Sequence, residues 1–185
     1  MMTLPNILTL LRIAMIPFFV VCFYLDFRFS AVLAAAVFGV AALTDWLDGY
    51  LARRLDQSSR FGAFLDPVAD KLMVAVVLIV LLQARPTLWL AVPVAVIIGR
   101  EITVSALREW MAEIGARRKM AVSWLGKVKT TLQMIALVVL IISSDAAAPQ
   151  WMTLCGATML YVATVITLWS MFDYLRLAWP DLMER

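Results

Sequence analysis

The chain of 185 residues contains no histidine, and only 16% of its residues are charged. Without imidazole, any acid–base or cation chemistry has to come from carboxylates. A soluble domain has about a quarter of its residues charged and about half apolar, whereas here 64% are hydrophobic. The composition therefore excludes an ordinary soluble domain and indicates a protein that resides in a membrane.

Cysteine is also scarce, with only two residues in the chain. Cys22 and Cys155 both fall inside apolar segments, where a small buried thiol is the usual finding, so we expect no disulfide framework. The first residues, MMTLPN, lack the basic region and the small-residue cleavage site of a secretory peptide. We therefore expect the first apolar segment to be retained as a membrane span.

Long apolar runs predict an all-α polytopic membrane protein with six transmembrane helices, in a single domain over residues 1–185. A helix that crosses a bilayer needs about 20 mostly apolar residues, and no segment alternates as a barrel strand would. Residues 3–12 are a candidate for a short interfacial helix before the first span. The predicted spans lie near residues 7–25, 31–52, 64–83, 87–107, 121–142 and 151–175.

Basic residues are distributed unevenly between the two sides of this predicted bundle. The connections at 26–30, 84–86 and 143–150 contain few of them, and the opposite side, which holds both termini, contains most. By the positive-inside rule, that side faces the cytoplasm. Because apolar stretches separate the basic residues, the net charge of +3 indicates contact with membrane lipids and no nucleic acid partner.

The most specific segment runs TDWLDGYLARRLDQSSRFGAFLDPVADKL, from the end of the second span into the third. Asp45 and Asp48 are three residues apart, and Asp66 and Asp70 are four apart, so each pair lies on one face of its own helix. The short connection makes the two helices antiparallel neighbours, so we expect all four carboxylates to share one pocket. The alternative is that they are ordinary charges near helix ends.

Four carboxylates in one pocket repel one another, and they therefore either take up protons or bind cations. Two divalent ions would neutralise them, and ligands that are all oxygen favour magnesium or manganese over zinc. Gly49 and Ala52 leave room for a diphosphate or sugar close to the helix, although tight helix packing also explains them. Gly62 suits the turn into the third span, and Arg53 suits either phosphate binding or cytoplasmic anchoring.

Taken together, these residues resemble the signature of the CDP-alcohol phosphotransferase family. All eight specified positions match, namely Asp45, Asp48, Gly49, Ala52, Arg53, Gly62, Asp66 and Asp70. Eight fixed residues across one short segment form a much more specific signal than a lone glycine motif. Three further stretches, PNILTLLRI, GREITVSALREWMAE and SWLGKVKTTLQM, are similar to the branch that uses CDP-diacylglycerol and sn-glycerol 3-phosphate.

The resemblance implies a bacterial inner-membrane enzyme, with a cytoplasmic active site, that transfers a phosphatidyl group between those substrates and releases CMP. It implies a magnesium or manganese site of two ions held by the four aspartates, with Asp70 as the candidate base. It also implies a homodimer. The residues that it implies for CDP binding are Asp45, Asp48, Gly49, Ala52, Arg53 and Gly62.

The acceptor of that reaction is a small dianion, and its pocket needs cations. Arg100 and Glu101 lie deep enough in the fourth span to be costly if unpaired, which favours a substrate role or a mutual ion pair. The start of the fifth span also suits an anion, although anchoring at the membrane surface explains its lysines as well. The candidate acceptor residues are Arg100, Arg108, Lys127, Lys129 and Thr130.

Two other functions compete with this interpretation. The first is a sister transferase of the same family that uses another acceptor, such as inositol phosphate or serine. The second belongs to another class: a divalent-cation transporter whose carboxylates carry ions through the membrane. The predicted acidic cluster lies at one membrane edge, whereas transport sites tend towards the middle of the bilayer, so the sequence favours a transferase.

Overall fold

The computed structural model describes residues 4–55, 60–115 and 124–183, and over these ranges the chain is helical with short connections. For residues 4–5, 46, 48–55, 60, 63, 124–127 and 181–182, the description covers the backbone only. The helices are α1 (Leu4–Tyr24), α2 (Ser30–Leu55), α3 (Arg60–Ala84), α4 (Leu88–Glu113), α5 (Trp124–Ile142) and α6 (Gln150–Met183). Each contains one of the six predicted apolar segments or nearly all of it, so the prediction of an all-α chain is confirmed.

Three of these helices are long and apolar enough to cross a membrane: Asn6–Tyr24, Leu88–Glu113 and Gln150–Pro180. Within the residues whose side chains are described, α2 and α5 contain the shorter apolar stretches Ser30–Asp45 and Val128–Ile142. The predicted short interfacial helix does not form a separate element within the described residues, since α1 runs unbroken from Leu4.

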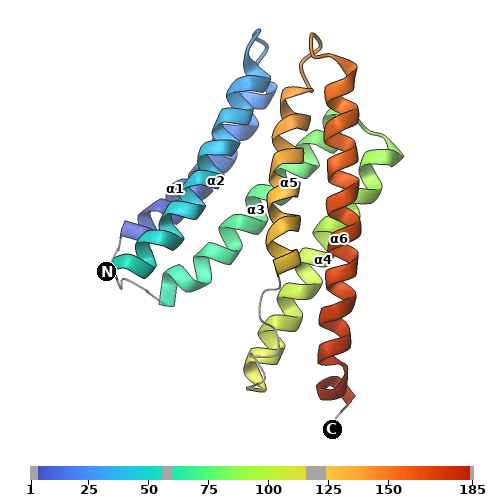
Figure 1. Ribbon diagram of the computed structural model, residues 1–185. Coiled ribbons are helices and arrows are strands. Elements are labelled where there is room, and N and C mark those ends of the chain that lie inside the picture. The colour runs from blue at the N-terminus through green and yellow to red at the C-terminus, as the bar shows by residue number, and fades with distance from the viewer. Residues whose placement is uncertain (1–3, 56–59, 116–123, 184–185) are drawn as a thin grey trace.

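The helices form two groups with α3 passing obliquely between them (Figure 1). Helix α1 packs along α2 and also against α3, while α6 packs against both α5 and α4. Contact between α2 and α3 themselves is slight. The free ends of α1 and α6 lie towards the lower part of the view, together with the end of α2 and the start of α3. The end of α2 and the start of α3 carry the family signature.

Small residues on α2 allow its neighbours to approach closely, as is usual between helices in membranes. Ala34 and Ala41 are almost fully buried, and they pack in one core with Phe19 of α1 and Leu137 of α5. Close packing of α5 on α6 depends on Gly156, where an added Cβ would lie only 2.9 Å from the Leu140 side chain. The core therefore holds α1, α2 and α5 against one another.

Large apolar side chains cover much of the outer surface. Phe18, Trp89 and Trp169 are 54%, 79% and 67% exposed, and a monomer in water rarely shows so much apolar surface. Cys155 also lies on this surface, so the expectation that both thiols are buried is wrong for Cys155 and correct for Cys22. The surface and the three long apolar helices together fit a membrane protein.

Candidate active site

A cavity of about 570 Å³ lies among the six helices, and each of them contributes to its lining. Three of the four predicted aspartates line it: Asp45 from α2, and Asp66 and Asp70 from α3. Four of the five predicted acceptor residues line it as well, namely Arg100, Arg108, Lys129 and Thr130. The structure thus joins two sets of residues that are far apart in the sequence.

The aspartates of α2 and α3 are held together through a third helix. Arg12 of α1 places Nη1 at 2.6 Å from Oδ1 of Asp45, and the same nitrogen donates to Oδ1 of Asp70. Thr9, one turn earlier on α1, donates from Oγ1 to Oδ1 of Asp66 at 2.6 Å. The predicted meeting of the two carboxylate faces is therefore correct in outcome, but α1 makes the connection.

Sequence reasoning missed this contribution of α1, although a signal was present. Asn6, Thr9 and Arg12 follow one another at three-residue spacing, which places them on one face of the helix. All three are at most 3% exposed. A buried arginine in an apolar span is costly without a partner, so this stripe predicts an anionic neighbour. What it could not specify is which of the carboxylates would be that neighbour.

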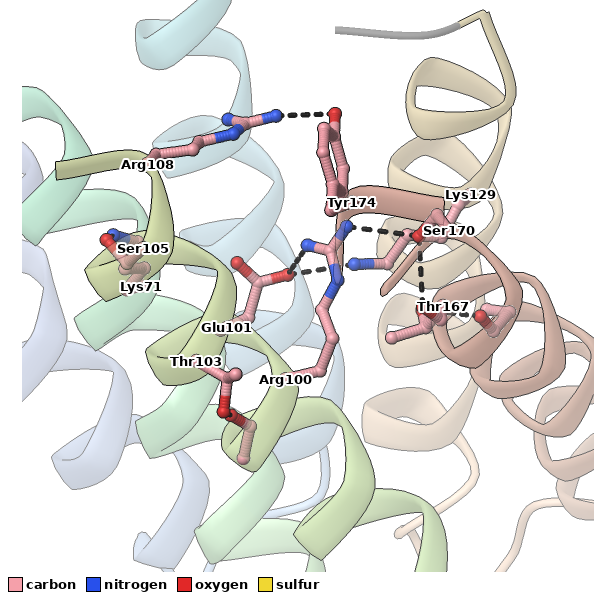
Figure 2. A network of polar contacts seen from close by, with 12 residues as sticks. Lys71, Arg100, Glu101, Thr103, Ser105, Arg108, Lys129, Thr167, Ser170 and Tyr174 are labelled. Carbon is pink, nitrogen blue, oxygen red and sulfur yellow. Dashed lines mark hydrogen bonds and ion pairs between the residues drawn. The ribbon is translucent and has the colours of Figure 1, made fainter. Parts of the chain in front are cut away.

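A second polar network lies on α4, α5 and α6 (Figure 2). Oε1 of Glu101 accepts hydrogen bonds from Nη1 of Arg100 at 3.1 Å and from Nζ of Lys129 at 2.8 Å. Arg100 and Lys129 are 9% and 3% exposed, so Lys129 is not an anchor at the membrane surface. The Arg100–Glu101 ion pair, the alternative to a substrate role, is present, and both residues line the cavity. With Lys129 included, the three charges sum to a surplus of one positive charge.

Helix α6 completes this network with residues that the sequence did not single out. Arg100 donates from Nη2 to Oγ of Ser170 at 3.1 Å, and Arg108 donates from Nη2 to the hydroxyl of Tyr174 at 2.7 Å. Tyr174 also places its ring centroid 5.0 Å from the Arg108 guanidinium carbon. These contacts fix two cationic side chains beside the cavity before any anion arrives.

Known proteins place this arrangement in a family. The sequence profile of the CDP-alcohol phosphatidyltransferases matches residues 2–171. The chain belongs to this family. A relative from Pseudomonas fluorescens is 56% identical over 98% of the chain and 92% of its own length. Relatives from Pectobacterium atrosepticum and Salmonella typhimurium are 54% and 50% identical, each over at least 97% of both chains. All three are named CDP-diacylglycerol–glycerol-3-phosphate 3-phosphatidyltransferase.

Part of the family signature lies where the structure describes no side chain. Of the predicted CDP-binding residues, Gly62 is buried at the start of α3. The same limit applies to one predicted acceptor residue in the first turn of α5. The predicted site residues whose side chains the structure does not describe are Asp48, Gly49, Ala52 and Arg53 of α2 and Lys127 of α5.

The metal site expected for this family can be examined at the aspartates that are described. Among the residues whose side chains the structure describes, a set that omits Asp48, no three carboxylate or thiol groups are arranged to hold a metal ion. Asp45 and Asp70 nevertheless direct oxygens from two helices towards a single cationic nitrogen of Arg12. Such all-oxygen donors fit a hard divalent cation.

A smaller cavity of about 210 Å³ lies between α3 and α4. Its lining is mostly apolar and includes Ala75 and Ile98, while Lys71 and Glu101 belong to both cavities. Leu72 and Ile102 also line it, and they are 45% and 64% exposed on the outer surface. The small cavity therefore lies between the apolar exterior and the charged interior.

Proposed function

We propose that this protein transfers the phosphatidyl group of CDP-diacylglycerol to sn-glycerol 3-phosphate, giving phosphatidylglycerol phosphate and CMP. The observation that carries the proposal is the single cavity that joins the carboxylates of α2 and α3 to the cations of α4 and α5. The names of the relatives support the same pair of substrates. A nucleotide lipid and a small phosphate would then meet at one place.

The transfer needs a base at the acceptor. The hydroxyl oxygen of glycerol 3-phosphate forms a bond to the phosphorus that bears diacylglycerol, and the bond from that phosphorus to the CMP oxygen breaks. Asp70 lines the cavity and is 49% exposed there, so it takes the proton that the acceptor hydroxyl loses. Magnesium or manganese held by Asp45, Asp48, Asp66 and Asp70 would neutralise the diphosphate and the charge that develops on CMP.

We assign the two substrates to different sets of residues, CDP to the family signature and the acceptor to α4 and α5. Gly49, Ala52, Arg53 and Gly62 bind the CDP group together with Asp45 and Asp48, by resemblance to the family motif. Lys127 belongs to the acceptor side with Arg100, Arg108, Lys129 and Thr130. Of these, Arg100 and Lys129 are buried and already oriented by Glu101, which suits a dianionic phosphate that has to leave water.

A lipid substrate also needs an apolar route to the reacting phosphorus. The small cavity between α3 and α4 supplies one, because it shares Lys71 and Glu101 with the large cavity. We place an acyl chain of CDP-diacylglycerol there. The protein would then lie in a bacterial inner membrane with six spans, cytoplasmic termini and site, and a second copy as its dimer partner.

An acceptor panel tests this function. The purified protein is supplied with CDP-diacylglycerol, magnesium and one acceptor at a time, and CMP release is measured. We expect release with glycerol 3-phosphate and little with serine or inositol phosphate. Release only with one of those acceptors would assign the protein to a sister transferase. Metal flux in proteoliposomes without any CMP would assign it to transport.

A further inference from the structure

Arg12 occupies an unusual position for a basic residue in an apolar helix. Its side chain is 2% exposed, whereas those of Asp45 and Asp70, which it contacts, are 42% and 49% exposed. The two aspartates come from helices that scarcely contact each other. The guanidinium group contacts both carboxylates and, although it is almost fully buried, it lines the same cavity as they do.

The contact has an electrostatic consequence for a divalent ion. Nη1 of Arg12 lies at hydrogen-bond distance from Oδ1 of both aspartates. Magnesium would bind such oxygens at about 2.1 Å, so it would compete with that nitrogen for the same lone pairs. The positive charge of the guanidinium also opposes a second cation a few ångströms away, because the attraction of the carboxylates is already partly neutralised.

We propose that Arg12 is a built-in counter-cation of the aspartate pair. It holds Asp45 and Asp70 together while no divalent ion is bound, and it competes with that ion for their oxygens. This inference rests on the metal dependence in the proposed function and assigns a positioning role to a residue outside the family signature. It predicts that loss of the Arg12 charge strengthens metal binding while it weakens the metal-free fold.

Metal affinity is the first test, because it does not depend on turnover. Manganese binding to the detergent-purified protein is measured by electron paramagnetic resonance for the wild type, R12K and R12Q. We expect R12Q to bind manganese more tightly by about threefold or more, and R12K to remain within about twofold of the wild type. The matched control is R28Q, which removes the same charge from the 25–29 connection and should change nothing.

Thermal unfolding in chelator and in manganese is the second test. We expect R12Q to unfold at a lower temperature than the wild type in chelator, and manganese to remove most of that difference. A residue with only a structural role would leave the same difference in both conditions, and that result would overturn the proposal. If R12Q folds only in manganese, the proposal is supported, and if it folds in neither condition, the proposal is wrong.

The outcomes separate this inference from the proposed function. Manganese binding by the wild type with equal or weaker binding by R12Q would overturn the role of Arg12 and leave the transferase intact. No manganese binding by either protein would overturn both the counter-cation and the metal-dependent mechanism.

Discussion

Asp70 and Lys129 line the same cavity but have different partners, and this difference assigns them different kinetic roles. Asp70 contacts Arg12 of α1, in the acidic set, whereas Lys129 contacts Glu101 of α4, in the cationic set. A base acts on the reacting hydroxyl, and a phosphate-binding cation acts on affinity. We therefore expect substitution of Asp70 to lower kcat and substitution of Lys129 to raise the KM for glycerol 3-phosphate.

Replacing Asp70 by Asn keeps the size of the side chain but removes the proposed base and the charge of one proposed metal ligand. We expect kcat to fall by about 10²- to 10⁴-fold, the usual contribution of a positioned base, while the protein still folds and binds CDP. Steady-state CMP release and CDP binding measure the two effects. D26N, in the exposed 25–29 connection, is the control with normal turnover. Near-normal turnover of D70N would reject the assignment.

Replacing Lys129 by Gln removes one buried cation from the acceptor network. We expect the KM for glycerol 3-phosphate to rise by about 10- to 100-fold, because a hydrogen bond to a charged group contributes about 1.5–3 kcal/mol. The KM for CDP-diacylglycerol should stay unchanged. An equal rise for both substrates, or no rise for glycerol 3-phosphate, would remove Lys129 from the acceptor pocket. R28Q is again the matched loss of charge.

At the scale of the helices, α1 proves more important for the site than its sequence indicated. The three- and four-residue spacings correctly placed each aspartate pair on one helix face. They also led to the expectation that the carboxylate faces of α2 and α3 meet, and Asp45 and Asp70 do line one cavity, with Arg12 of α1 bound to both. Sequence periodicity shows which face of a helix is polar but not which helix packs against that face, so the Arg12 bridge required the structure.

The apolar cavity between α3 and α4 gives a prediction for these elements. A75W fills this cavity, and we expect it to raise the KM for CDP-diacylglycerol several-fold, because a bulky side chain takes the place of an acyl chain. The KM for glycerol 3-phosphate should not change. I79W is the matched control, since Ile79 lies on α3 at 55% exposure and outside the cavity. Equal effects of the two substitutions would place the acyl chain elsewhere.

For the whole molecule, the sequence predicted the helices better than it predicted how they pack around the cavity. Six apolar runs identified six helices because hydrophobic length is a strong local signal. Arg100 and Lys129 were both expected in the acceptor pocket because a dianion needs cations, and they do line one cavity. Ser170 and Tyr174 of α6 were not foreseen, because single polar residues on a long apolar helix do not show which groups they contact.

We propose that this one cavity makes a lipid product from a nucleotide lipid and a small phosphate. The most direct measurement is the balance of products from purified protein, CDP-diacylglycerol, glycerol 3-phosphate and magnesium. We predict CMP and phosphatidylglycerol phosphate in equal amounts, with neither formed when the acceptor is omitted. CMP without that lipid, or no CMP under any of these conditions, would contradict the account.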